Sequence, residues 1–218
     1  MWYRAAQPDG LQRSMQFLEL CPQPGPERAY ALITAGRLAT TVMDLQLARR
    51  LLAEALPMAD STGDDGIEPL ACFLLGVSLF LSGQLDPARQ WLSRALDLYS
   101  AAGDQCGTGR STATLGVVAF FAGDWPRATA VLEQALALLT AAGDRWGQGL
   151  CHTYLGLTAK ETGDTRGAER HLVEGIRLLT PLRDVAILGI AFAELAAVER
   201  PTFQFGERLR LRPPLADR

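Results

Sequence analysis

The chain has 218 residues and 48% of them are apolar, which is enough to build the core of one or two domains. Its formal net charge is −3 and no charged block stands at either end. This argues against direct nucleic-acid binding, since such proteins usually carry a basic stripe. No apolar run reaches the roughly 18 residues that indicate a membrane span, and residues 1–8 lack the pattern of a secretory signal.

The cysteines indicate a reducing compartment. Cys21, Cys72, Cys106 and Cys151 form no CxxC pair, and the chain is not small, so we predict free thiols and a cytoplasmic protein. The sequence also contains no Asn and a single Lys, Lys160. Both residue types have A-rich codons, so their scarcity favours a GC-rich bacterial gene.

We expect residues 1–218 to form one helical-repeat domain that begins with an N-terminal half repeat and linker at 1–26. Within residues 1–20 the pattern indicates the end of one helix followed by a second helix. The stretch 21–26 contains three prolines and a glycine, which predicts a stiff connector.

Residues 27–200 repeat at a fixed spacing, which is the signature of a stacked helical array. Asp64, Asp104, Asp144 and Asp184 stand 40 residues apart. Each block contains a Leu-Gly pair, then a small residue 12 positions after that Gly, a Leu four positions later, and another small residue three positions after the Leu. These positions are Leu75, Gly76, Ala88, Leu92 and Ala95, then Leu115, Gly116, Ala128, Leu132 and Ala135, then Leu155, Gly156, Ala168, Leu172 and Gly175.

Each block is predicted to contain two helices. Apolar or small residues recur at the spacing of one helix face, and the alternation typical of strands is absent. Gly residues stand where the second helix of a block should end, and an Asp follows as the N-cap of the next helix. The prediction is an all-α solenoid of antiparallel helix pairs, with about nine or ten helices and no sheet. The expected helix-ending glycines are Gly63, Gly103 and Gly143, and the expected caps are Asp44, Asp64, Asp104, Asp124, Asp144, Asp164 and Asp184.

The Leu-Gly, Ala, Leu, Ala pattern resembles the tetratricopeptide-repeat family, which implies a right-handed α-solenoid. The aromatic residue that usually precedes Leu-Gly is replaced here by Cys72, Thr112 and His152. The 40-residue spacing with Gly-Asp joints is similar to the C-terminal helical region of large bacterial regulators that carry an NTPase module and a helix-turn-helix domain. Residues 201–218 depart from the pattern and are expected to form a C-terminal cap or tail.

Other chemistry has weaker support in the sequence. Residues 104–112 have a passing likeness to a phosphate-binding loop, but the required Gly and Lys are replaced by Asp104 and Arg110, so we interpret the stretch as a repeat junction. Cys151 and His152 adjoin each other and His171 lies on the paired helix, but a metal site needs three or four converging ligands. We therefore assign no catalytic residue, no metal and no cofactor.

A second face of each first helix can be separated from the positions that contact its paired helix. The family resemblance implies that this face lines a concave groove, which would suit a ligand with an apolar body and one charged end, or an amphipathic helix. Burial of the same phenylalanines in an ordinary core is an equally weighted alternative. The candidate ligand-binding residues are Phe73, Val77, Phe80, Ala113, Val117, Phe120, Thr153, Leu157, Lys160 and Glu161.

These patterns favour a protein-interaction or effector-binding module with a regulatory role, as a part of or a partner to a bacterial transcriptional regulator. The expected partner is a protein or peptide segment, with a small apolar effector as an alternative; no direct nucleic-acid or membrane contact is expected, and a homodimer is compatible. The competing hypothesis is a helical-repeat enzyme of a biosynthetic pathway. It would need convergent titratable groups in a concave pocket, and the sequence offers only Lys160 and Glu161 on the expected face.

Overall fold

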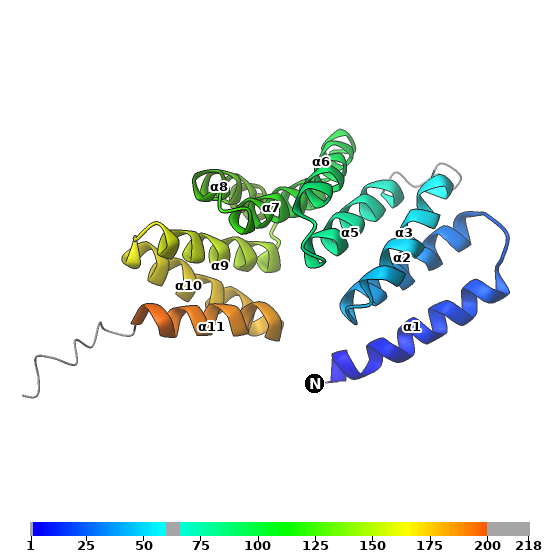
Figure 1. The fold of residues 1–218 in the computed structure, drawn as a ribbon, viewed down its shortest axis with the longest axis horizontal. Helices are drawn as coiled ribbons and strands as arrows, with labels where there is room; N and C mark the ends of the chain where they lie inside the picture. The colour runs from blue at the N-terminus through cyan, green and yellow to red at the C-terminus, as the bar shows by residue number, and fades with distance from the viewer. Residues whose placement is uncertain (1, 60–65, 200–218) are drawn as a thin grey trace, which may run out of the picture.

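The computed structural model describes residues 2–59 and 66–199, and within these ranges it contains ten α-helices, two short 3₁₀ turns and no strand (Figure 1). This confirms the predicted all-α class. The elements are α1 Trp2–Leu20, α2 Pro26–Thr41, α3 Leu45–Ala55, η1 Leu56–Met58, α5 Ile67–Leu81, α6 Leu85–Ala101, α7 Gln105–Phe121, α8 Trp125–Ala141, α9 Arg145–Glu161, α10 Thr165–Leu179, η2 Thr180–Leu182 and α11 Val185–Glu199.

The helices form antiparallel pairs that stack in chain order, as Figure 1 shows. The pairs are α2 with α3, α5 with α6, α7 with α8 and α9 with α10, and the second helix of each pair also packs on the first helix of the next. The first helices α5, α7, α9 and α11 contact one another along the array. The prediction of two helices within residues 1–20 is wrong, because α1 runs without a break from Trp2 to Leu20.

Helix starts follow the predicted caps. The carboxylates of Asp44, Asp104, Asp124, Asp144 and Asp164 each accept a hydrogen bond from the backbone N–H three residues later. Asp184 likewise accepts from the N–H groups of Ala186 and Ile187, both at 3.1 Å. Each cap satisfies a backbone donor that the helix itself leaves without a partner. Two expected positions, Gly63 and Asp64, lie outside the described residues.

The helix ends also follow the prediction. Gly103 and Gly143 have φ angles of 70° and 69°, in the left-handed region that a residue without Cβ adopts most easily. Arg183 occupies the same place before Asp184 and is left-handed as well, with a φ of 54°. The last joint therefore keeps the geometry of the others without the residue that favours it.

The contact between the two helices of a pair, which we call the seam, depends on the Leu-Gly glycines. A Cβ added to Gly116 would lie 2.7 Å from Cγ of Leu132, and Gly76 and Gly156 meet Leu92 and Leu172 at 2.6 and 2.7 Å. These distances are shorter than a van der Waals contact, so only glycine allows this approach. The predicted close crossings are confirmed.

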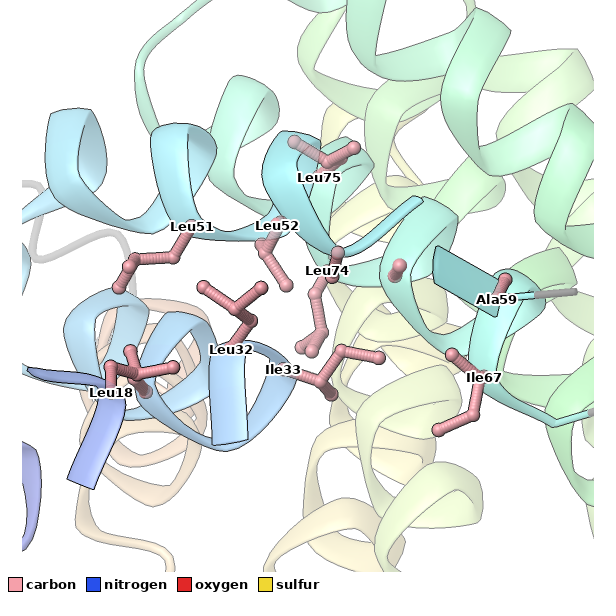
Figure 2. Close-up of a cluster of buried hydrophobic side chains, with 12 residues drawn as sticks. Leu18, Leu32, Ile33, Leu51, Leu52, Ala59, Ile67, Leu74 and Leu75 are labelled. Atoms are coloured by element: carbon pink, nitrogen blue, oxygen red, sulfur yellow. The ribbon is translucent and has the colours of Figure 1, made fainter. Parts of the chain in front are cut away.

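The core runs along the array and joins neighbouring pairs. Figure 2 shows its N-terminal part, where Leu18 of α1, Leu32 of α2, Leu51 of α3 and Leu74 of α5 meet. Four helices share this cluster, so no single pair buries it alone. None of the described helices is both long and apolar enough to cross a bilayer.

Candidate binding surface on the first helices

Four aromatic side chains from three consecutive first helices form a continuous cluster, which we call the aromatic ridge: Phe80, Phe120, Phe121 and Tyr154. The ring of Phe121 lies 5.2 Å from that of Phe80 on α5 and 6.1 Å from that of Tyr154 on α9. Phe120 contacts both Phe121 and Tyr154, with centroids 5.4 and 5.7 Å apart and edge-to-face geometry. Such pairs stabilise one another beyond the area that they bury.

The outer part of the ridge is open to solvent. The side chain of Phe121 is 54% exposed, although it is a large apolar group. Phe80 and Phe120 are half-buried, whereas Tyr154 is buried, and burial raises the pKa of its phenol. Three other rings already hold the exposed Phe121 ring in place. A partner that covers this ring therefore causes little further loss of side-chain entropy.

The other predicted groove residues divide into two sets. Ala113 and Thr153 are fully buried and Val117 is 4% exposed, so their side chains belong to the packing of the array. Phe73, Val77 and Leu157 are half-buried, and Phe73 packs against three neighbouring core clusters. The surface that a ligand could reach therefore lacks the three buried positions, and its most exposed apolar side chain is that of Phe121.

The C-terminal end of this face is charged. Lys160 is exposed on α9, and its Nζ lies 2.5 Å from a carboxylate oxygen of Glu194 on α11. The hydrogen bond to Glu194 raises the pKa of the Lys160 ammonium group. Glu161, the last predicted residue, is exposed beside it. The face thus combines an apolar centre with a polar end, as the sequence predicts.

Sequence reasoning did not select Phe121 and Tyr154. Phe121 immediately follows the selected Phe120 and is the 40-residue counterpart of the selected Glu161, so the register already places it on this face. Tyr154 stands one position before Leu155 and aligns with Leu74 and Thr114. The signal that could have identified Phe121 is the Phe-Phe pair at the end of a first helix.

The stretch at 104–112 is a repeat junction, as interpreted. Asp104 caps α7, and Nε of Arg110 donates to a carboxylate oxygen of Asp144 at 2.6 Å. The Arg110 guanidinium also lies 5.7 Å from the ring of Trp146. Arg110 therefore joins the start of α7 to the start of α9 and is already occupied by protein groups.

His152 and His171 meet, which sequence reasoning did not foresee. Their Nδ1 atoms are 3.0 Å apart across the contact of α9 with α10. Both rings are half-buried, and desolvation, followed for His152 by the neighbouring imidazole, lowers both pKa values. The described residues contain no group of three or more His, Cys, Asp or Glu side chains placed to hold a metal ion.

Comparison with known proteins agrees with this architecture. Residues 68–141 match the family model described as tetratricopeptide repeat. No curated protein matches the sequence.

Solved structures resemble the fold at low sequence identity. A Rap conjugation gene regulator of the plasmid pLS20, solved in complex with the Phr peptide, aligns with a TM-score of 0.79 at 14% identity over 92% of this chain and 55% of that one. BtubC from P. vanneervenii aligns with a TM-score of 0.66 at 17% identity over 89% of this chain and 81% of that one.

A third neighbour is a signal transduction ATPase with numerous domains from Pyrococcus horikoshii, which has a tetratricopeptide repeat sensor. Its TM-score is 0.63 at 18% identity, over 86% of this chain and 29% of that one. The chain spans about half the length of several such structures, 53% of RapI and 46% of an aspartyl phosphate phosphatase from Bacillus subtilis among them. Residues 68–141 are thus tetratricopeptide repeats, and the described chain as a whole is a tetratricopeptide-repeat-like α-solenoid.

Proposed function

We propose that this chain is a protein-interaction module that holds a peptide or a protein segment on the face formed by the first helices of its repeats. The observation that carries the proposal is the aromatic ridge. Phe121 is 54% exposed on one helix and contacts rings from the helices on both sides. A rigid aromatic anchor of this kind is typical of the residues that dominate binding energy at interfaces.

The chemistry of the face suggests the form of the ligand. The ridge offers an apolar centre, and the ion pair of Lys160 with Glu194 lies at the C-terminal side. A carboxylate on the ligand can take the place of Glu194 beside Lys160 at little cost, because the Lys160 side chain is exposed and that of Glu194 is partly exposed. The expected ligand is a segment with apolar side chains in its middle and an acidic group at one end.

A regulatory role is part of the same proposal. The similar structures include a Rap conjugation gene regulator bound to a peptide and an ATPase with a repeat sensor. By analogy with them, this chain would serve as the sensor part of, or a partner to, a bacterial transcriptional regulator. Fold similarity alone does not fix function, so the ridge rather than the fold is the feature to test.

The test is selection of peptides from a random displayed library on the full chain, followed by titration of the selected sequences against variants. Phe121→Ala should weaken binding of the selected peptides by about tenfold or more, which corresponds to the roughly 1.4 kcal/mol or more expected of an interface anchor. Lys160→Glu should weaken only peptides that carry an acidic group.

The matched control is Val173→Ala. Val173 is 48% exposed on α10, a second helix, so it is an equally exposed apolar residue away from the ridge. Binding should be unchanged in this variant. If Phe121→Ala binds every selected peptide as well as the Val173→Ala control does, the ridge is not the site and the proposal fails.

A further inference from the structure

A groove of about 580 Å³ lies between α6 and α8, with α7 as its floor. Leu96 and Val131 contribute to its walls, and Thr112, Leu115 and Ala119 contribute to the floor. Leu115 on the floor stands two positions before Val117. Their side chains therefore point in directions about 200° apart around the helix axis, so they lie on opposite faces of α7. The groove therefore opens on the side of α7 away from the aromatic ridge.

Comparison of three consecutive repeats explains why the groove exists. In each repeat, a residue of the first helix has a counterpart 19 positions later on the second helix. In the preceding repeat the two are Cys72 and Trp91, and the Trp91 ring packs half-buried against the cluster that contains Cys72. In the following repeat they are His152 and His171, whose Nδ1 atoms are 3.0 Å apart.

The middle repeat has the smallest pair at this place. Thr112 and Val131 carry no ring, and both line the groove. The Thr112 hydroxyl donates to the carbonyl of Thr108 at 2.8 Å, so this donor is satisfied and needs no partner in the groove. In the preceding repeat an indole stands at this position, whereas the two imidazoles of the following repeat line a separate depression beside α10.

The rim of the groove carries two arginines and three aspartates, which are Arg89, Arg127, Asp86, Asp97 and Asp124. Arg127 on α8 lines the groove and is exposed. Its backbone N–H donates to the Asp124 cap, whereas its guanidinium has no ion-pair partner among the described residues. Arg89 on the opposite wall is already paired with Asp86 at 2.5 Å. Asp86 is paired with Arg89 and Asp124 caps α8, so Arg127 is the cation at this edge with which an anionic group could pair.

We propose that this groove is a second ligand site, which takes a small molecule with a flat aromatic ring system and one anionic group. The ring occupies the position that Trp91 fills one repeat earlier, and the anion lies beside Arg127. A volume of about 580 Å³ is within the range of small-molecule sites. This site is separate from the ridge and does not depend on the function proposed for it.

The probe for a test is anilinonaphthalene sulfonate, which combines two aromatic groups with one anionic group. Fluorescence titration of the full chain should show one saturable site. Val131→Trp places an indole in the groove, as in the preceding repeat, and should abolish saturable binding. Arg127→Gln should weaken binding by up to about fivefold, the effect of losing one exposed ion pair.

The controls separate the groove from the ridge. Ala137→Trp adds the same side chain to an exposed position of α8 outside the groove and should leave binding unchanged. Phe121→Ala should also leave it unchanged. A folded Val131→Trp variant that binds the probe like wild type overturns the proposal, as does loss of binding in Phe121→Ala alone.

A measurement on the wild-type protein makes the test independent of whether the Trp variant folds. Bound probe should shift the amide NMR signals of Thr112 and Val131 and leave those of Phe80 and Phe121 in place. The reverse pattern shows that the probe binds the ridge and contradicts the proposal.

Discussion

Two contacts between the helices of one repeat differ sharply in how much their residues vary. One is the seam, and the other, which we call the outer contact, is made by the pairs of residues 19 positions apart. Along the seam, Gly76, Gly116 and Gly156 each face a Leu at the same short distance. At the outer contact the three repeats carry unrelated pairs: Cys72 with Trp91, Thr112 with Val131, and His152 with His171. The seam positions hold the helices together, so packing limits them to one solution.

The outer pairs are less constrained because they lie beside the space between successive second helices, as Thr112 and Val131 do. A ring can pack there, two imidazoles can meet there, or the space can remain open as the groove beside Val131. The same backbone therefore carries three different local environments. Repeat proteins can acquire a site in this way without changing the contacts that define the fold.

The most severe way to break the comparison is to put a large residue into the seam. Gly116→Leu should lower the free energy of unfolding by about 1–3 kcal/mol or more through overpacking, because even a Cβ there lies 2.7 Å from Leu132. The control is Gly189→Leu on α11, where an added Cβ meets nothing within 4 Å. Equal thermal midpoints for the two variants would show that the seam does not limit residue size.

The second test separates packing from exposure within the ridge. Phe120 is half-buried and packs against the cluster that contains Leu132, so Phe120→Ala should cost about 2 kcal/mol, less than the loss of a fully buried Phe. Phe121→Ala should cost under about 1 kcal/mol, because its ring is 54% exposed. Urea unfolding of both variants measures the difference. A cost of about 3–5 kcal/mol for Phe120→Ala would assign that residue to the core instead of the ligand surface.

The third test concerns the outer pair of histidines. Desolvation lowers both pKa values below their ordinary range. The unfolded chain therefore binds more protons than the folded chain just below the ordinary pKa of about 6.5, and stability must fall as the pH drops through that region. Unfolding free energies measured between about pH 7.5 and 5.5, above the range where ordinary carboxylates titrate, should show the loss.

The control for this pH dependence is the double variant His152→Thr with His171→Val. It copies the pair of the preceding repeat, Thr112 and Val131, and has no group that titrates in this window at the outer contact. The wild-type protein should lose more stability on acidification than the double variant does. A pH dependence of the same size in both proteins would mean that the histidine contact does not control it.

The smallest expected effect is at the charged end of the ridge. Lys160→Ala removes the ion pair with Glu194, and both partners are partly exposed. The free energy of unfolding, measured by thermal unfolding, should therefore change by less than about 1 kcal/mol. A larger loss would show that this pair holds α11 against α9. An equal loss of unfolding free energy in Glu194→Ala would confirm this role of the ion pair, because either variant breaks the same contact.

The repeat register was predictable from the sequence because glycine, aspartate and leucine each have one physical role at fixed spacing. The caps at Asp104 and Asp144 and the close approach at Gly116 follow from local chemistry. The sequence could not decide between core and groove for the second face of the first helices. That outcome depends on how far neighbouring repeats rotate against each other, which local patterns do not encode.

The contact of His152 with His171 was missed for a related reason. Each histidine was considered on its own helix, although the spacing of 19 residues is the same one that pairs Cys72 with Trp91. Pairing positions 19 residues apart in all repeats would have placed the imidazoles together. It would also have shown Thr112 with Val131 as the smallest pair, which is the signal for the groove.

The stacking of the pairs has a consequence for cooperativity. Each described helix packs only on near neighbours in the array, so the free energy of folding is close to a sum of local terms and the chain can open from one end while the rest stays folded. A peptide lying along the ridge would touch α5, α7 and α9 at once and would add a link that spans three repeats. Binding would then make separate units unfold together, and a single sharp transition would replace stepwise opening.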